Sequence, residues 1–271
     1  MFGGIPFYLS LINAKESLVQ NVDRLFFAQG GIMRSEFDEL YNALFSNADL
    51  YISVVKGLAA HHDGMSREEI SKATGITGGT LTRVLTNLER CDFISRNQNF
   101  AHKVKDTIYR LVDFYTLFYY KFILPDVSGD EQWWSHHFES RQVSTWQGLT
   151  FEIVCLMHTD SIKRALGISG MATEVSSWRK AATDGQNGGQ IDLVIKRADR
   201  IIHLCEMKFS KSQYRITEAY EQLLRQRLEL FQSSTKTKYS LVITFVTTYG
   251  IADGLHHSLV HSEVTMEQLF I

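Results

Sequence analysis

Two apolar runs parted by a short polar turn stand out in the C-terminal half of the chain, at residues 189–195 and 201–209. Each run has the length of a strand, so together they predict a β-hairpin. Asp192 interrupts the first run, and Glu206 and Lys208 interrupt the second. Because side chains alternate between the faces of a strand, Glu206 and Lys208 are expected on the same side of the hairpin.

The segments on either side of the hairpin alternate between helical and strand patterns. Helical spacing of apolar residues runs from Trp146 to about Leu166, with Glu152 inside the apolar stripe. After the hairpin, residues 217–231 predict a helix, and residues 239–247 predict a buried strand. This order indicates an α/β/α layer arrangement for residues 146–271.

Residues 46–125 have a different pattern, in which short helices precede a hairpin. A helix at residues 50–61 is followed by a capping box at Ser66 and Glu69, then by a second helix at residues 80–90. The polar residues 96–99 indicate the tip of a hairpin. Helix, turn, helix and hairpin is the winged helix-turn-helix plan. Such folds bind DNA or dock proteins, and the sequence leaves both alternatives open.

If the second helix of this motif lies in the major groove, the wing lies along the DNA backbone. The residues then expected near base edges are Thr80, Thr82, Arg83 and Asn87, and those expected near phosphates are Arg96, Lys103 and Lys105.

The next segment, residues 113–124, is densely aromatic. It favours a helix packed between two domains over a platform on which bases stack. Pro125 ends this helix, and the polar, acidic residues 126–145 predict a linker.

Composition narrows the class of protein. The chain has 44% hydrophobic and 21% charged residues, and it contains no apolar run of about 18 residues that would span a membrane. Three widely spaced cysteines indicate buried, reduced thiols and a cytoplasmic protein. The net charge of −2 means that any DNA contact is local and sensitive to salt. No GxxxxGK[ST] motif occurs, so no nucleotide cofactor is expected.

The acidic residues of the hairpin have a chemical interpretation. Carboxylates are hard oxygen ligands for Mg²⁺ or Mn²⁺, and a nearby lysine orients a nucleophile or offsets phosphate charge. The candidate catalytic residues are therefore Glu152, Asp192, Glu206 and Lys208. Asp192 and Glu206 are expected to bind the metal, Glu152 to bind it directly or through water, and Lys208 to orient the nucleophile. From the residues alone, a structural Asp–Lys ion pair is about as good an interpretation.

Taken in order, these segments resemble the C-terminal half of archaeal-type AAA+ ATPases, and the resemblance covers essentially the whole chain. The motifs that carry it lie at residues 3–8 (GGIPFY), 21–27 (NVDRLFF), 66–94, 109–114, 146–152 (WQGLTFE), 190–193 (QIDL) and 205–209 (CEMKF).

The resemblance implies an α+β multidomain protein. A helical lid remnant would occupy residues 1–45, a winged helix-turn-helix residues 46–125 and a PD-(D/E)XK nuclease-like domain of restriction-endonuclease type residues 146–271. It also implies that Glu152, Asp192, Glu206 and Lys208 converge on one pocket. The P-loop module of the family is missing, and a split gene, a remnant and a shortened chain all remain open explanations.

Two functions follow from the resemblance. The first is a duplex-binding protein with a metal-dependent DNA endonuclease domain. The second is a non-catalytic regulatory or assembly module of an ATPase system. In either case residues 1–45 are expected to fold back on the winged helix, to self-associate or to meet an ATPase partner. The apolar side chains that would normally pack on the missing core are Leu9, Leu11, Leu18, Leu25, Phe26 and Phe27.

Overall fold

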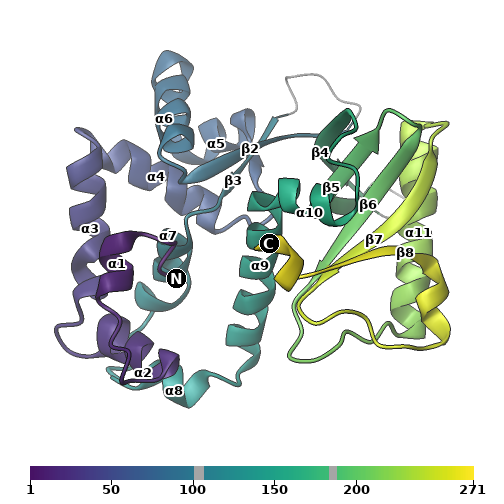
Figure 1. The fold of residues 1–271 in the computed structure, drawn as a ribbon. Coiled ribbons are helices and arrows are strands. Elements are labelled where there is room, and N and C mark those ends of the chain that lie inside the picture. Colours follow the sequence, from purple (N-terminus) through teal and green to yellow (C-terminus); the bar gives the residue numbers. More distant parts are fainter. Residues whose placement is uncertain (101–106, 183–187) are drawn as a thin grey trace. The chain divides into compact units, whose positions relative to one another are not determined.

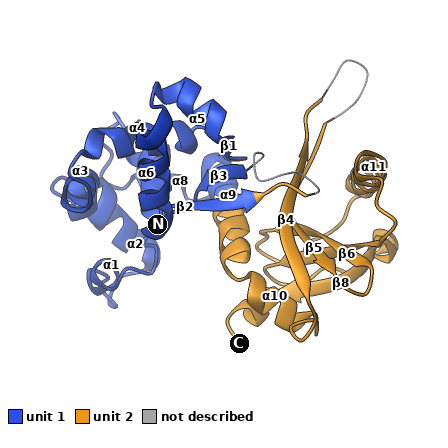
Figure 2. Cartoon of the chain, turned by 90° about the horizontal axis from the view of Figure 1, so that it is seen from above, with its two compact units in different colours: residues 1–97, 107–146 blue, residues 98–106, 147–271 orange. Residues whose placement is uncertain are grey.

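The computed structural model of the chain describes all residues except 101–106 and 183–187. It forms two compact units, shown in separate colours in Figure 2. The first unit contains residues 1–97 and 107–146, and the second contains residues 98–106 and 147–271. The described residues form a mixture of helices and two sheets, consistent with the expected α+β class.

The first unit is mostly helical. Its elements are α1 (Pro6–Ser10), α2 (Leu18–Val22), η1 (Asp23–Phe27), α3 (Ile32–Leu44), α4 (Ala48–Ala59), β1 (Met65–Ser66), α5 (Arg67–Thr74), α6 (Gly78–Arg90), β2 (Ile94–Gln98), β3 (Thr107–Leu111), α7 (Phe114–Phe118), η3 (Tyr119–Ile123) and α8 (Trp133–His137). Helix α9 (Arg141–Met157) begins in this unit and continues into the second.

The order α4–β1–α5–α6–β2–β3 reproduces the helices and hairpin expected from residues 46–125, and the three strands form a sheet in the order β1-β3-β2. The capping box forms as predicted, because the Ser66 hydroxyl accepts from the Glu69 amide and the Glu69 carboxylate accepts from the Ser66 amide. The expected hairpin tip at residues 96–99 is wrong, since β2 continues to Gln98. The side chains of Lys103 and Lys105 lie outside the described residues.

An aromatic cluster forms the core of the first unit. The rings of Phe26 and Phe118 lie 4.8 Å apart, and Tyr115 donates a hydrogen bond to the Met33 carbonyl. The aromatic segment at residues 113–124 therefore packs against residues 1–45 rather than forming an open platform. As a consequence, Leu25, Phe26 and Phe27 are buried within the unit.

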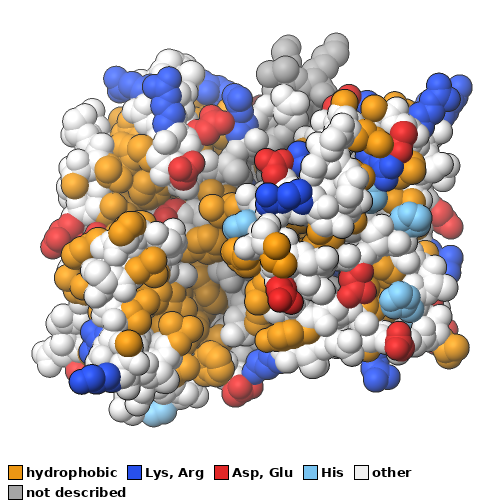
Figure 3. Space-filling model, viewed as in Figure 1, with side chains coloured by type: hydrophobic (Ala, Val, Ile, Leu, Met, Phe, Trp, Pro, Cys, Tyr) orange, Lys and Arg blue, Asp and Glu red, His pale blue; other side chains and the backbone are white. Residues whose placement is uncertain are grey.

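Other apolar side chains of residues 1–45 stay at the surface. Phe7 is 53% exposed, Leu9 47% and Leu18 62%. Figure 3 shows hydrophobic side chains over the α1 and α2 part of this unit. The expectation that residues 1–45 fold back is thus confirmed for Leu25–Phe27 and does not hold for Leu9 or Leu18.

Part of the linker predicted at residues 126–145 is helical, because it contains α8 and the start of α9. The Asp23 carboxylate accepts hydrogen bonds from the Trp134 and Ser135 amides, which fixes the beginning of α8. The Ser140 hydroxyl accepts from the Val143 amide and caps α9, so this helix starts before Trp146. One polar residue of the predicted linker, Ser140, is thus a helix cap, and the start of α8 is held by Asp23 from residues 1–45.

The second unit contains a five-stranded sheet in the order β4-β5-β6-β7-β8. Its elements are α10 (Thr159–Ala165), β4 (Thr173–Lys180), β5 (Gly189–Arg197), β6 (Ile201–Lys208), α11 (Glu218–Thr235), β7 (Ser240–Thr247), η4 (Leu255–Leu259), β8 (Val260–Thr265) and η5 (Glu267–Leu269). The predicted hairpin is β5–β6, which is antiparallel, whereas β6–β7 and β7–β8 are parallel. The long helix expected from Trp146 is divided at His158 into α9 and α10.

Helices cover both faces of this sheet (Figure 1). Phe151 and Cys155 of α9 pack with Cys205 and Met207 of β6 on one face. On the other face, Phe231 of α11 packs with apolar residues of β4, β5 and β6, including Ile202 and Leu204. The alternation along β6 therefore places Glu206 and Lys208 on the α11 face, together with Ile202 and Leu204.

Two further expectations are settled by the described residues. Cys155 and Cys205 are buried, but Cys91 is exposed because it follows α6 as its C-terminal cap. Among the described helices, none is long and apolar enough to cross a membrane.

A buried histidine makes the stability of the second unit depend on pH. His203 is 2% exposed, and burial together with the Arg197 charge lowers its pKa from 6.5 to about 4. Arg197 Nη1 donates to Nε2 at 3.1 Å, so the ring is neutral and its Nδ1–H donates to Thr244 Oγ1 at 2.8 Å. The unfolded chain binds a proton here at higher pH than the folded chain does.

We therefore expect this contribution to stability to be complete above pH 6.5 and to be lost as the pH falls toward 4. The loss should reach about 3 kcal/mol, which corresponds to the size of the pKa shift. Urea unfolding between pH 7 and pH 4.5 measures it. A His203→Gln variant should show a flatter pH dependence, whereas His61→Gln, an exposed control, should not. Equal slopes for the parent and His203→Gln would contradict the assignment.

Candidate functional site

The strands β5 and β6 part at the two acidic residues of the hairpin. Their pairing runs from Lys196 opposite Ile202 to Leu193 opposite Cys205, and Asp192 and Glu206 follow directly after this last pair. Two strands that separate at their ends leave room between them for side chains and ligands. The acidic residues thus lie where the hairpin opens.

A β-bulge lies at the same place on the other edge of β5. Val194 pairs with Ser176 of β4, and Ile191 pairs with Trp178, so β5 carries one residue more than β4 across this step. The extra residue falls within residues 192–193. A bulge bends a strand and redirects a side chain, and bulges are common beside active sites. Asp192 is therefore placed by a local irregularity rather than by simple alternation.

The Glu206 carboxylate is buried, with 8% of the residue exposed, and protein groups bind both of its oxygens. Arg227 Nη1 donates to Oε1 at 2.6 Å, and the Tyr220 hydroxyl donates to Oε2 at 2.7 Å. Both donors come from α11. A buried carboxylate needs such partners, because an unpaired charge costs several kcal/mol at a site with little water.

Lys208 lies beside the same carboxylate. Its Nζ is 3.6 Å from Glu206 Oε2 and 5.1 Å from the centre of the Tyr220 ring. The distance to Glu206 is that of an ion pair, and the ring position adds a cation–π contact. The predicted Glu-x-Lys pair thus lies on one face of the sheet, and Tyr220 of α11 contacts both side chains.

These charges change the ionisation of their neighbours on α11. Burial and the Glu206 carboxylate raise the pKa of Tyr220, so its hydroxyl stays protonated and serves as a donor. Burial lowers the pKa of Arg227, but the Glu206 carboxylate and, less strongly, Asp192 more than offset this, and the net pKa is raised. Arg227 therefore remains a cation within reach of both acidic residues.

Asp192 and Glu152 lie differently from Glu206. The Gln190 side-chain amide donates to Asp192 Oδ1 at 2.9 Å. Glu152 is half-buried on α9, and that helix packs on the face of the sheet opposite to α11. The Glu152 and Glu206 side chains therefore start from opposite faces, whereas Glu206 and Lys208 form an ion pair on the same face.

The fit of a divalent ion depends on how many oxygens are available to it. The donor set is chemically suitable, since Asp192 and Glu206 supply carboxylate oxygens. Within the described part of the chain, however, no three Asp, Glu, His or Cys side chains gather closely enough to hold a metal ion. Both oxygens of Glu206 already bind Arg227 and Tyr220. In this arrangement the residues do not fit a bound divalent ion.

A pocket of about 880 Å³ opens beside these residues, between the start of β5 and the middle of α11. Two of its lining residues are the partners of the acidic side chains, namely Gln190, which binds Asp192, and Arg227, which binds Glu206. Lys180, Gln226 and Glu229 also line it. The pocket is thus bordered by the two side chains that bind the Asp192 and Glu206 carboxylates.

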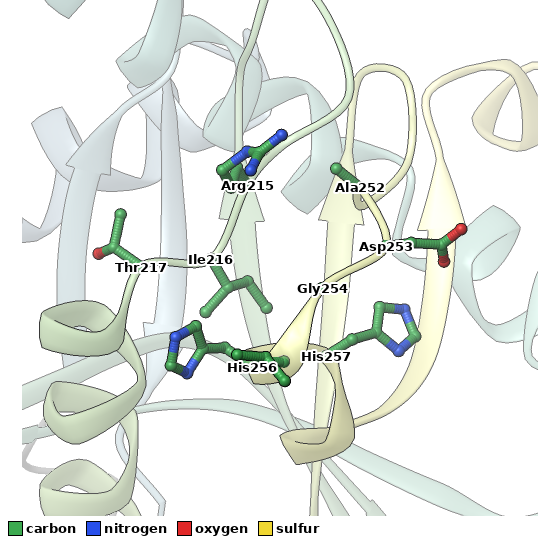
Figure 4. Close-up of a pocket in the computed structure, with 9 residues that line it drawn as sticks. Arg215, Ile216, Thr217, Ala252, Asp253, Gly254, His256 and His257 are labelled. Atoms are coloured by element: carbon green, nitrogen blue, oxygen red, sulfur yellow. The ribbon is translucent and has the colours of Figure 1, made fainter.

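A second pocket, of about 410 Å³, lies at the other end of α11 (Figure 4). It is lined by Arg215 before the helix and by His256 and His257 of η4. His256 Nδ1 forms a hydrogen bond with Glu221, and His257 lies 4.0 Å from Glu263. Because each histidine has an acidic neighbour and none of the four predicted catalytic residues lines this pocket, it is separate from the candidate site.

The residues predicted to contact DNA divide into two groups. Thr80, Thr82 and Arg83 are exposed on α6, although Thr82 also accepts a hydrogen bond from Arg67 at 3.0 Å. Asn87 instead donates to the Tyr51 hydroxyl at 2.8 Å, so its side chain is engaged within the first unit. Arg96 is exposed and lies 3.4 Å from Glu89. The exposed set available to DNA is smaller than expected.

Two residues of the site were missed from the sequence, Tyr220 and Arg227. The sequence predicted a helix at residues 217–231 but gave Arg227 no role. A signal was present, because Tyr220, Leu224, Arg227 and Phe231 follow helical spacing on one face, and Leu224 and Phe231 are buried. An arginine on an otherwise apolar stripe indicates a buried acidic partner.

A comparison with known protein families found no match to this chain, and no curated protein is similar to it. The resemblance to the AAA+ ATPase family therefore stays a prediction.

The hydrogen bond from Tyr220 should have a measurable effect on stability. A Tyr220→Phe variant keeps the ring and removes the donor to a charged carboxylate, which should cost about 1–2 kcal/mol. Urea unfolding of this variant is compared with Tyr249→Phe, whose side chain is exposed and should change stability little. If both variants unfold at the same urea concentration as the parent, Tyr220 does not hold Glu206 in solution.

Proposed function

We propose that the chain is a DNA-binding protein whose second unit hydrolyses phosphodiester bonds with Mg²⁺ or Mn²⁺. The observation that carries this proposal is the position of three side chains. Asp192 and Glu206 follow the last pair of β5 and β6, and Lys208 lies on the same face as Glu206. Acidic residues and a lysine at the opening between two strands are typical of metal-dependent nucleases.

The topology of the second unit supports the same proposal. Helices precede three antiparallel strands, and α11 then crosses to β7, which is parallel to β6. This is the order expected of a restriction-endonuclease-like domain. Ligands of open α/β sheets bind beyond the carboxyl ends of strands, which is where Glu206 and Lys208 lie in β6.

Each side chain has a role in this proposal. A metal ion held by Asp192 and Glu206, with Glu152 ligating directly or through water, would polarise the phosphate and activate a water molecule. Lys208 would hold the nucleophilic water and offset negative charge on the phosphate. Arg227 also binds Glu206 Oε1, so the ion would compete with Arg227 for the negative charge of this carboxylate.

The first unit supports DNA binding through a winged helix. Its α5–α6 pair and the β2–β3 hairpin have the order of that motif, and Thr80, Thr82 and Arg83 are exposed on α6. With few arginines on this helix, base discrimination would be modest and affinity would come mainly from phosphate contacts.

One observation favours a second function, a non-catalytic regulatory or assembly module. The Glu206–Arg227 pair is what a structural ion pair would look like, and it neutralises the charge of Glu206. The exposed Phe7, Leu9 and Leu18 also suit an assembly surface, and self-association or an ATPase partner through residues 1–45 is part of this alternative.

Cleavage of plasmid DNA with Mn²⁺ separates the two functions. We expect the purified chain to nick the plasmid, and Lys208→Ala to be slower by about a hundredfold, because it loses a cation at the reacting phosphate. Asp192→Asn should be inactive. Lys196→Ala is the matched control, since this lysine pairs with Glu174 away from the site. Absence of cleavage by the parent, or equal cleavage by Lys208→Ala, favours the non-catalytic module.

Binding to a labelled duplex tests the first unit. An Arg83→Ala, Arg96→Ala double variant should bind at least about tenfold more weakly at low salt, since one cationic contact near base edges and one phosphate contact are lost. Arg164→Ala, an exposed arginine on α10, should bind as the parent does. If the double variant folds and its binding curve matches that of the parent, the winged helix does not bind DNA and a protein-docking role is the better explanation.

A further inference from the structure

The strand β4 is the last strand at one edge of the five-stranded sheet. An edge strand presents a row of N–H and C=O groups on its outer side, ready to pair with another extended segment. At residues 177–179 such a segment is present. The Phe100 amide donates to the Ser177 carbonyl at 2.6 Å, and Asn99 and Ser177 form a parallel β-bridge. Residues 99 and 100 thus extend the sheet beyond β4.

This segment belongs to the second unit, although the strands on either side of it in the sequence belong to the first. The chain passes into the second unit at Gln98, where β2 ends, and returns to the first unit at Thr107, where β3 begins. Residues 98–100 are the described part of this passage and have the colour of the second unit in Figure 2. Their contact with β4 is therefore internal to the second unit.

The Asn99 side chain replaces a backbone peptide at the edge. Its Oδ1 accepts from the Arg179 amide at 3.1 Å, and its Nδ2 donates to the Arg179 carbonyl at 3.4 Å. A neighbouring strand would satisfy these two groups with its own C=O and N–H. A primary amide carries both an acceptor and donors, whereas an ionised carboxylate has no donor. The edge therefore favours asparagine over aspartate at this position.

The Phe100 ring anchors the segment on the α11 face of the sheet. Its centre lies 5.0 Å from that of Phe231, which is fully buried and contacts the Trp178 ring at 5.3 Å. Phe100 thereby packs against the hydrophobic cluster that α11 forms with β4, β5 and β6. Tilted and edge-to-face aromatic pairs of this kind stabilise a contact beyond the burial of their area.

We propose that the edge of β4 at residues 177–179, together with the Phe231 ring, is a docking site for an extended segment in which asparagine precedes an aromatic residue, and that its occupant is residues 98–100 of the same chain. In strand addition, main-chain bonds give affinity and side-chain pockets give specificity. A tethered segment also binds at the effective concentration set by its connection, which favours it over a free one.

The docking site has a consequence for the winged helix. The winged-helix plan places the hairpin after α6 along a DNA backbone. The segment that follows β2 is instead assigned to a protein contact. The site uses none of Asp192, Glu206 and Lys208, and its tests require neither DNA nor a metal, so it stands or fails separately from the proposed function.

A disulfide tests which chain supplies the occupant. In a Cys91→Ser background, which removes the exposed thiol, Asn99→Cys and Ser177→Cys lie opposite each other across the bridge. Mild oxidation should join them within one chain. Gln98→Cys with Ser177→Cys is the control and should react more slowly, because neighbouring side chains of an extended segment point to opposite faces. Failure to form the disulfide, or a covalent dimer on non-reducing electrophoresis, would overturn the assignment.

Hydrogen exchange of the Arg179 amide tests the role of Asn99. Asn99→Ala removes the acceptor and should speed exchange at least about tenfold, because the outer side of β4 then opens locally. Asn97→Ala, the neighbouring asparagine of β2, is the matched control and should exchange as the parent does. The same exchange rate in Asn99→Ala and in the parent would show that this side chain does not hold the edge, which contradicts the proposal.

A labelled peptide of residues 94–100, ISRNQNF, tests recognition by the edge directly. A Phe100→Ala chain leaves the ring site open and should bind the peptide at least about tenfold more tightly than the parent, in which the tethered segment competes. A peptide carrying Phe100→Ala should bind to neither chain. Phe7→Ala, whose ring is exposed in the first unit, is the control and should behave as the parent does. Circular dichroism establishes that each variant is folded. Equal binding of the peptide to the parent and to Phe100→Ala would overturn the docking site.

Discussion

The second unit is organised around a negative charge that its sheet cannot leave unpaired. Glu206 lies in a strand whose other residues are mostly buried, between Cys205 and Met207. Removing a carboxylate from water is costly unless donors surround it. The helix α11 supplies those donors as Tyr220 and Arg227, which lie on the same face as Leu224 and Phe231. Packing of α11 on the sheet therefore also pairs the charge of Glu206.

The position of this charge follows from the geometry of the strands. Pairing between β5 and β6 ends one residue before Glu206, and the bulge at residues 192–193 interrupts the pairing of β5 with β4 at the same level. A regular sheet would have placed apolar side chains against both helices here. The irregularity instead concentrates polar groups at one point, and sheet irregularities of this kind often mark functional sites.

The sequence predicted much of this fold because strand periodicity and capping are local. The β5–β6 hairpin, β7 and the capping box at Ser66 depend on neighbours within a few residues, and they were found. The start of α9 was missed because the cap at Ser140 lies within a stretch that is polar on average. Composition of a segment does not reveal a single capping hydroxyl.

The partners of Glu206 could not be predicted in the same way. Alternation along β6 indicates the face of the sheet on which Glu206 lies, but not which residues of a helix that starts ten residues after the strand will meet it. The expected convergence of Glu152 also depended on how α9 packs, and that helix lies on the opposite face. Such long-range contacts depend on how the helices pack against the sheet, which periodicity along one strand does not encode.

The Glu206–Arg227 pair links the stability of the fold to the availability of this carboxylate to other cations. Arg227 stabilises the folded chain because it neutralises Glu206, and for the same reason it lowers the affinity of that carboxylate for any other cation. Lys208 also compensates this charge, and its Nζ lies 3.6 Å from the other oxygen of Glu206, Oε2. Weakening the arginine pair would make the carboxylate more available and this part of the fold less stable. The two properties share one carboxylate, so neither can be optimised without the other.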